Sequence, residues 1–255
     1  MLPELAELLL PGGCAGCGVR RVVLRRGVCG ACAAELAGLR PYPTAPTPAP
    51  PGMPPCRAVG EYAGALRGVL LAYKERGRHG LARPLGALLA TAVAQAVPRG
   101  RQVLVVPVPS TARARRERYG DHMARMATHA VRRLRAAGWE AALGQVLTVG
   151  PRPDSASLDA AGRRIAAESS LRIRRSRIRV LRRAATMRST LVVVDDIVTT
   201  GATLTAVTGR LEEANMQVTA AAVLAATRLR HAPRDEAGTS PARVFRHRLG
   251  SPNEG

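Results

Sequence analysis

Apolar runs and helical spacings alternate through the central part of the chain. Continuous apolar runs predict buried strands at 102–109 (QVLVVPVP), 191–194 (LVVV) and 217–227 (QVTAAAVLAAT), with a shorter strand at 59–62. Apolar residues three and four apart predict helices over 66–73, 81–97, 121–134 and 203–213. We therefore expect an α/β protein whose buried strands alternate with amphipathic helices.

The strand at 191–194 runs directly into two adjacent carboxylates, Asp195 and Asp196. In an open α/β sheet, ligands bind at the carboxyl ends of the strands, where these two side chains are expected. Carboxylates at this position suit a polyol, because its hydroxyl groups can donate hydrogen bonds to them.

A turn of small residues follows, and the next helix begins inside it. The turn carries the hydroxyl groups of Thr199, Thr200 and Thr203 around Gly201. The first turn of a helix leaves backbone N–H groups free and has a partial positive charge, so it suits a phosphate. Residues 191–204 (LVVVDDIVTTGATL) therefore predict a site for a phosphorylated polyol. The alternative interpretation is an ordinary buried strand, turn and helix start.

Four of the five cysteines form two C-x-x-C pairs beside glycines, at Cys14, Cys17, Cys29 and Cys32. Four thiolates in this pattern suit a structural Zn²⁺, and small modules of this type fold when the metal binds. Two disulfides are an alternative that a cytosolic compartment disfavours, and an iron–sulfur cluster is another. The fifth cysteine, Cys56, is given no role.

The composition narrows the class of protein. Hydrophobic residues make up 46% of the chain and aromatic residues only 2%, so the core must consist of Ala, Val and Leu. No apolar run reaches the length of about 18 residues that a membrane span needs. The apolar N-terminus lacks a basic start and is not interpreted as a signal peptide, so we expect a cytoplasmic protein.

The net charge of +21 first suggests nucleic acid or another polyanion as a partner. Of the 39 basic residues, however, Lys74 is the single lysine and the others are arginines. Together with the abundance of Ala, Gly and Pro, this excess of arginine is also what GC-rich coding would produce. The net charge therefore has two interpretations: binding of nucleic acid, or an arginine content that reflects GC-rich coding.

Proline divides the chain. Residues 41–55 (PYPTAPTPAPPGMPP) contain eight prolines and predict an extended, semi-rigid linker. We expect a zinc-ribbon-like module at 1–40, a linker at 41–57, the α/β domain at 58–230 and a disordered tail at 231–255. Within the domain, 110–118 predicts an arginine-rich turn, and the alternation in 171–181 (LRIRRSRIRVL) predicts a basic hairpin edge beside a mobile, lid-like stretch from 150.

The stretch 191–204 resembles the phosphoribosyl pyrophosphate (PRPP) signature of type I phosphoribosyltransferases. With the cysteine pairs and the proline-rich segment before it, the chain resembles the ComF family of competence-associated, phosphoribosyltransferase-like bacterial proteins. The resemblance implies a parallel sheet with flanking helices and a hood, preceded by a small four-cysteine zinc ribbon. The chain differs from the family pattern in two places. At Arg118–His122 the family often has R-G-F-N-Q, and at Ser155 and Ala166 the family has Gln and Asn.

The resemblance also implies a ligand site. It places PRPP, or a ribose phosphate, on Asp195, Asp196, Thr199, Thr200, Gly201, Ala202 and Thr203, with the two aspartates as catalytic residues. It places pyrophosphate beside Lys74, Pro107, Val108, Pro109, Arg113 and Arg163, with Mg²⁺ bridging the ribose hydroxyls and the pyrophosphate. Other matching positions are Tyr62, Gly77, Arg116, Arg118 and Leu158.

Three functions fit these features. The first is phosphoribosyl transfer from PRPP to an undefined acceptor. The second is a non-catalytic accessory role in DNA uptake or repair, with single-stranded DNA or competence and recombination proteins as partners, although few aromatic residues are available to stack on bases. The third is a regulator that senses PRPP. The oligomeric state is open.

Overall fold

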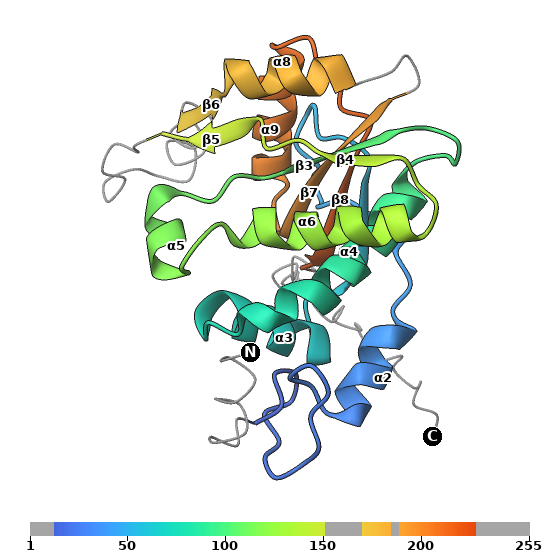
Figure 1. Ribbon diagram of the computed structural model, residues 1–255, viewed down its shortest axis with the longest axis vertical. Coiled ribbons are helices and arrows are strands. Elements are labelled where there is room, and N and C mark those ends of the chain that lie inside the picture. The colour runs from blue at the N-terminus through green and yellow to red at the C-terminus, as the bar shows by residue number, and fades with distance from the viewer. Residues whose placement is uncertain (1–12, 151–169, 185–188, 228–255) are drawn as a thin grey trace, which may run out of the picture.

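The structure is a computed structural model that describes residues 13–150, 170–184 and 189–227. Its centre is a sheet of six described strands in the order β1-β2-β8-β7-β3-β4 (Figure 1). The strands are β1 (Tyr42–Thr44), β2 (Cys56–Glu61), β3 (Val103–Pro107), β4 (Ala141–Leu143), β7 (Thr190–Val198) and β8 (Ala220–Ala226). From β2 to β4 all neighbours are parallel, and β1 is an antiparallel edge strand. The predicted mixed α/β fold with a mostly parallel sheet is confirmed.

Helices cover both faces of this sheet (Figure 1). On one face lie α3 (Gly64–Glu75), the 3-10 turn η1 (His79–Leu81), α4 (Ala82–Ala96) and α6 (His122–Ala136), which share a core with β3 and β8. On the other face lie α9 (Ala202–Glu212), α8 (Arg175–Ala184) and an antiparallel pair, β5 (Leu147–Val149) with β6 (Leu171–Ile173). Every residue of β3 and β8 is buried, which explains their unbroken apolar sequences.

Small residues allow the layers to approach closely. A Cβ atom at Gly86 of α4 would lie 2.5 Å from His129 Cβ and 2.7 Å from the Met126 carbonyl oxygen of α6. β8 contributes five alanines to its seven positions, so helices pack close to its backbone. The core consists mainly of Ala, Val and Leu, as the low aromatic content of the sequence predicted.

Two segments differ from the sequence prediction. Residues Ala112–Glu117 form a short helix, α5, where a turn was predicted; the Thr111 hydroxyl caps it by accepting a hydrogen bond from the Ala114 N–H at 3.1 Å. The predicted hairpin edge at 171–181 is a strand only as far as Ile173, and helix α8 begins at Arg175. Ile178 and Leu181 are three residues apart, a helical spacing, and Ile178 is buried while Arg175 and Arg177 are exposed.

The proline-rich segment is attached to the sheet at several points. Tyr42–Thr44 pair with Cys56–Ala58, and a proline is compatible with this edge position. Further along, the segment packs on the turn before α9: a Cβ atom at Gly201 would lie 2.6 Å from Met53 Sδ and 3.2 Å from Pro46 Cγ. The segment expected to be a spacer therefore contacts the predicted phosphate turn. The predicted domain boundaries stay predictions.

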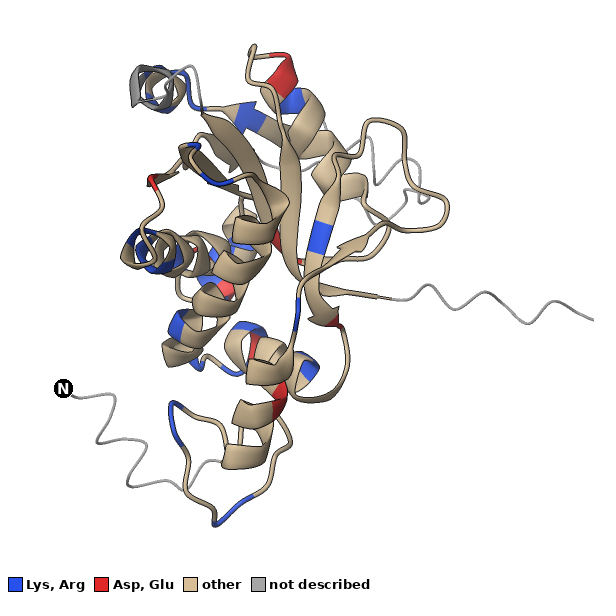
Figure 2. Ribbon diagram, turned by 90° about the vertical axis from the view of Figure 1, so that its right-hand side faces the viewer, with Lys and Arg blue, Asp and Glu red and all other residues tan. Residues whose placement is uncertain are grey.

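The N-terminal cysteine module lies against α3 (Figures 1 and 2). It contains α2 (Gly30–Gly38), and Glu35 Oε1 on that helix accepts a hydrogen bond from the Ala65 N–H at 2.8 Å. Arg78 donates to the Gly13 carbonyl at 2.8 Å. The contact requires glycine, because a Cβ at Gly68 would come within 1.9 Å of the Gly16 carbonyl oxygen.

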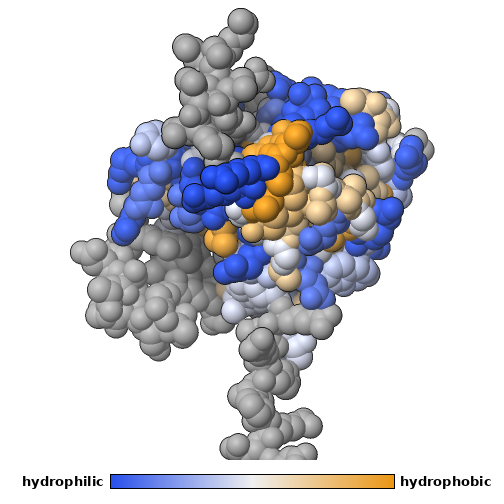
Figure 3. Space-filling model, turned by 90° about the horizontal axis from the view of Figure 1, so that it is seen from below, coloured by the Kyte–Doolittle hydropathy of each residue, from blue (hydrophilic) through white to orange (hydrophobic). Residues whose placement is uncertain are grey.

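The loop between the cysteine pairs carries an apolar patch. Val19, Val22 and Val23 are 43%, 43% and 84% exposed, and arginines flank them in the sequence. Viewed from this end of the molecule, an apolar surface is bordered by hydrophilic residues (Figure 3).

Elsewhere, Figure 2 shows basic residues along α6 and α8.

Candidate functional site

The two adjacent aspartates lie within β7, which continues through them to Val198. Neighbouring side chains on a strand point to opposite faces of the sheet. Asp196 is therefore on the face of α3 and α6, where Lys74 and His122 contact it. Asp195 lies on the face of α9, the same face as Val193. The sequence predicted that both carboxylates act on one ligand; the structure places them side by side along the chain but on opposite faces.

Asp196 is held by a lysine and a histidine side chain. Its Oδ2 atom is 2.9 Å from Lys74 Nζ and 2.9 Å from His122 Nε2, and only 7% of the residue is exposed. Burial opposes the charged carboxylate, but the His122 hydrogen bond and the Lys74 charge outweigh it and lower the pKa of Asp196 to about 2. Asp196 is therefore a carboxylate at neutral pH.

Asp195 differs from its neighbour in its electrostatic environment. It is half-buried, and its Oδ1 accepts a hydrogen bond from the Asp196 N–H at 2.8 Å. Burial, and then the charge of Asp196, raise the pKa of Asp195 to about 8. The adjacent pair therefore combines one ionised carboxylate with one carboxyl group that readily takes up a proton.

A chain of hydrogen bonds continues behind Asp196. The Nδ1 atom of His122 is 3.0 Å from Ser110 Oγ, and this hydroxyl is 3.0 Å from Asp121 Oδ1. His122 and Ser110 are each only 7% exposed. Tyr73 donates to the His122 carbonyl at 2.9 Å, so α3 also fixes the start of α6. Asp121 is the N-cap of that helix and accepts the Ala124 N–H at 3.0 Å.

The predicted phosphate turn joins β7 to α9. Gly201 is buried and has φ of +76°, a left-handed conformation that glycine adopts readily, and it is the N-cap of α9. Thr199, Thr200 and Thr203 are exposed, and Ala202 begins the helix. Exposed hydroxyl groups and the N–H groups of a helix start therefore lie at the carboxyl end of β7, an arrangement suited to an anion.

Residues 156–245 match the phosphoribosyl transferase domain. This range contains both aspartates, the phosphate turn, α9 and β8, while the partners Lys74 and His122 lie before it in the sequence. The chain thus contains a phosphoribosyl transferase domain. The sheet that includes β7 and β8 also contains strands that precede the matched residues, as far back as β1. No curated protein matches the chain in a sequence comparison.

The residues predicted to bind pyrophosphate separate into two groups. Lys74 contacts Asp196. Pro107 is the last residue of β3, and Val108 and Pro109 follow it; the Val108 N–H donates to the Val194 carbonyl at 2.9 Å. Arg113, in contrast, points away on exposed α5, with Nε 2.6 Å from Glu117 Oε1. Arg163 lies outside the described residues, as do Leu158, Ser155 and Ala166.

Two other arginines occupy the place expected for Arg113. Arg115 of α5 and Arg174, which follows β6, line a cavity of about 110 Å³ at the end of β3. Pro107, Pro109 and Asp121 also line it. Asp121 belongs to the hydrogen-bonded chain behind Asp196, so the cavity adjoins that chain. Arg118 instead forms an ion pair with Glu75 at 3.0 Å.

The four N-terminal cysteines form a candidate metal centre. Their Sγ atoms all lie within 4.8 Å of one another, and three of the four residues are buried. Burial disfavours a thiolate at Cys14, but backbone N–H groups, including that of Cys29 at 3.2 Å, outweigh it and lower the pKa of Cys14 to about 6. Four sulfur ligands at these separations fit Zn²⁺ and leave no open coordination position. The cysteines are free in the structure rather than paired as disulfides.

The sequence prediction assigned no role to Ser110, Asp121 and His122. The one available signal was that Asp121 and His122 stand where the resembling family has Asn and Gln.

Among the described helices, none combines the length and apolarity that a bilayer crossing requires.

Proposed function

We propose that the chain binds PRPP at the carboxyl end of β7 and transfers its phosphoribosyl group to an acceptor. The observation that carries the proposal is the position of the ionised Asp196, held by Lys74, next to a helix start with exposed threonines inside a matched phosphoribosyl transferase domain. Ribose hydroxyls and phosphates require these two kinds of group, oxygen acceptors and N–H or hydroxyl donors.

Each residue has a role set by its chemistry. The 5′-phosphate accepts hydrogen bonds from the Thr199–Thr203 turn and the first N–H groups of α9. A ribose hydroxyl donates to the ionised carboxylate of Asp196, and Asp195, on the other face of the sheet, lies next to it along the chain. Mg²⁺ would come with the substrate, because it is a hard cation that prefers phosphate oxygens as ligands. Its chemistry there is to offset the charge of the pyrophosphate.

The reaction breaks the bond between C1′ and the pyrophosphate and leaves positive charge on the ribose. The carboxylate of Asp196 stabilises that charge electrostatically. Lys74 is close enough to Asp196 to move between the carboxylate and a bound anion, and Arg115 and Arg174 offer two more charges for the departing pyrophosphate. No side chain is required as a general base, so catalysis rests on positioning and charge.

Titration calorimetry with PRPP and Mg²⁺ tests the binding site. We expect saturable binding that is lost when Asp195→Asn and Asp196→Asn are combined, with the fold retained by circular dichroism. Glu117→Gln is the matched control, because it removes an exposed acidic charge on α5. Unchanged affinity in the double variant would overturn the site assignment. Pyrophosphate release with a panel of acceptor bases then separates transfer from a sensor that binds PRPP without turnover.

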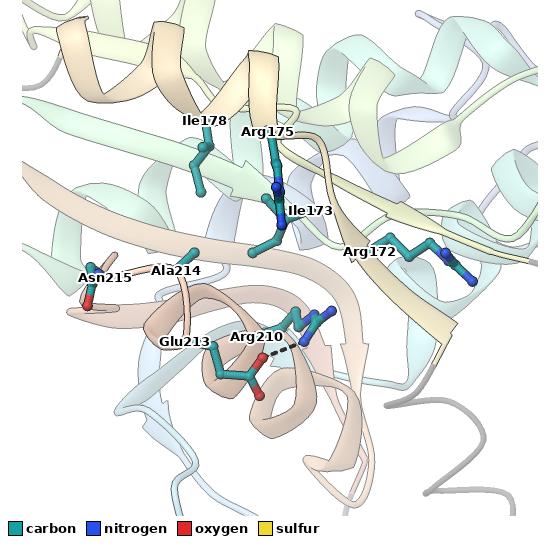
Figure 4. Close-up of a pocket in the computed structure, with 8 residues that line it drawn as sticks. All are labelled: Arg172, Ile173, Arg175, Ile178, Arg210, Glu213, Ala214 and Asn215. Carbon is teal, nitrogen blue, oxygen red and sulfur yellow. Dashed lines mark hydrogen bonds and ion pairs between the residues drawn. The ribbon is translucent and has the colours of Figure 1, made fainter.

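A second candidate function is binding of single-stranded nucleic acid, and one surface favours it. Five arginines are exposed along β6, the start of α8 and the residue between them: Arg172, Arg174, Arg175, Arg177 and Arg179. A cavity of about 510 Å³ lies between α8 and the end of α9, and two of these arginines, Arg172 and Arg175, line it together with Arg210 (Figure 4). Arg210 is paired with Glu213, and Arg175 extends from α8 toward the cavity.

Electrophoretic mobility shifts with single-stranded DNA over a range of salt concentrations test this second function. Phosphate contacts predict binding that weakens as salt rises, with a shallower salt dependence in a variant carrying Arg175→Ala and Arg177→Ala. Arg113→Ala, on exposed α5, is the control for loss of charge elsewhere. An equal loss in the control would indicate general attraction of the basic chain rather than a site on α8.

A further inference from the structure

His122 is enclosed by hydrogen-bond partners on both sides of its ring. Nε2 lies 2.9 Å from Asp196 Oδ2, and Nδ1 lies 3.0 Å from Ser110 Oγ. Ser110 Oγ lies a further 3.0 Å from Asp121 Oδ1. The four residues therefore form one continuous chain from the N-cap of α6 to the carboxylate in β7.

The hydrogen bonds along these four residues determine which ring nitrogens of His122 carry a proton. Asp196 is ionised and accepts, so Nε2 must carry a proton. Asp121 also accepts, because its two carboxylate oxygens already receive backbone N–H groups, Oδ1 from Ala124 and Oδ2 from Ser110. The single hydroxyl proton of Ser110 must then point to Asp121.

The remaining contact, between Ser110 Oγ and Nδ1, needs a proton as well. If the ring were neutral with its proton on Nε2, Nδ1 and the Ser110 oxygen would face each other as two acceptors at 3.0 Å. Both atoms belong to residues that are more than nine-tenths buried, where an unsatisfied contact is costly. A proton on Nδ1 satisfies every contact in the chain.

We propose that His122 carries protons on both ring nitrogens, and that the resulting imidazolium is a positioning residue for the carboxylate of Asp196. The charged and titratable groups around it are the carboxylates Asp196 and Asp121, the Lys74 ammonium, the Tyr73 phenol and, further along α6, Arg125. Burial raises the pKa of Tyr73 to about 12, so it is neutral. Two carboxylates therefore balance Lys74 and the imidazolium.

This arrangement orients Asp196 for a ligand. Lys74 and His122 both bind Oδ2, and within the described parts of the chain no hydrogen bond reaches Oδ1. The imidazolium thus fixes the carboxylate so that one oxygen stays available to accept a hydroxyl group. That consequence rests on the proposed function, in which the hydroxyl belongs to the ribose of PRPP, whereas the protonation of the ring does not.

Nitrogen-15 NMR of the full chain with labelled histidine, without ligand at pH 7, tests the ring. An imidazolium gives two similar nitrogen shifts, and a neutral ring gives two widely separated ones. We expect the similar pair for His122, assigned by its loss in His122→Gln and its retention in His129→Gln, which changes another histidine of α6. A separated pair in the wild-type protein would overturn the proposal.

Two variants extend the test. In Ser110→Ala the Nδ1 proton loses its acceptor, so the pair of shifts should separate; if it stays unchanged, the hydrogen-bond count is wrong. In His122→Gln, Asp196 loses a charge-assisted hydrogen bond, so PRPP should bind about tenfold more weakly or worse, while His129→Gln keeps wild-type affinity. Wild-type affinity in His122→Gln would refute the positioning role. If the wild-type protein binds no PRPP, the proposed function fails while the NMR result still decides the protonation.

Discussion

Replacing Lys74 with methionine removes the ammonium group that contacts Asp196 and keeps an apolar stem of similar length. The side chains of Lys74 and Asp196 are 19% and 9% exposed, so water compensates little for the lost contact. The pKa of Asp196 is lowered from 3.8 to about 2, which corresponds to about 2 kcal/mol in favour of the folded, ionised state; the His122 hydrogen bond and the Lys74 charge together outweigh burial to produce this shift, so Lys74 accounts for only part of it. A hydrogen bond to a charged group contributes a similar amount, about 1.5–3 kcal/mol.

We therefore expect Lys74→Met to lower the free energy of unfolding by about 2 kcal/mol at pH 7. With a urea dependence of about 2 kcal/mol per molar, the midpoint should fall by about 1 M. The single tryptophan, Trp139, is 9% exposed and provides the fluorescence signal for urea unfolding. The difference should shrink between about pH 4 and pH 2, because Asp196 gains a proton first in the unfolded chain, near its ordinary pKa of 3.8, while its pKa of about 2 keeps it charged longer in the folded protein.

Arg113→Met is the matched control, since it breaks an ion pair that is exposed on α5 and should leave the midpoint unchanged. The reasoning fails if Lys74→Met unfolds at the wild-type midpoint at pH 7. It also fails if the loss is as large at pH 3 as at pH 7, because the destabilisation would then come from packing and not from charge.

Three further predictions concern other parts of the site. Asp195 has a raised folded pKa of about 8, so the wild-type protein should lose stability relative to Asp195→Asn as the pH rises from 4 to 8 in urea titrations; a constant difference would contradict this. Gly201→Ala should cost at least about 1 kcal/mol, because φ is +76° and the new Cβ would meet Met53 Sδ at 2.6 Å; Met53→Ala should recover the part of this loss due to the clash, and full recovery would exclude a backbone contribution. The purified protein should contain one zinc per chain by mass spectrometry, and a chelator should lower its thermal midpoint; a Cys32→Ser variant with wild-type metal content would contradict the four-cysteine assignment.

The strands of the sheet could be predicted from the sequence because burial on both faces imposes continuous apolar runs. β3 and β8 are such strands, and the carboxylates after Val194 stand out against the apolar run. The turn before α9 could also be predicted, since Gly201 and its threonines form a local pattern, whereas its binding of phosphate stays a prediction. These features depend on residues close together in the chain.

The contacts of the site could not be predicted in the same way. His122 and Asp196 are 74 positions apart, and only the packing of α6 beside β7 brings them together. Arg113 follows β3 as predicted, but it points away because α5 forms and turns that side chain toward Glu117. The proline-rich composition predicted a linker at Tyr42–Thr44, but these residues form a strand that pairs with β2.

The contact of the proline-rich segment with Gly201 has a consequence for how this protein can change. The segment reaches the turn from a part of the sequence that lies more than a hundred positions earlier, with Pro46 and Met53 against the glycine. A chain shortened to begin at Ala58 would keep every aspartate and threonine of the proposed site but would lose these neighbours. Under the proposed function, substitutions at Pro46 or Met53 would then alter PRPP affinity without contacting the ligand.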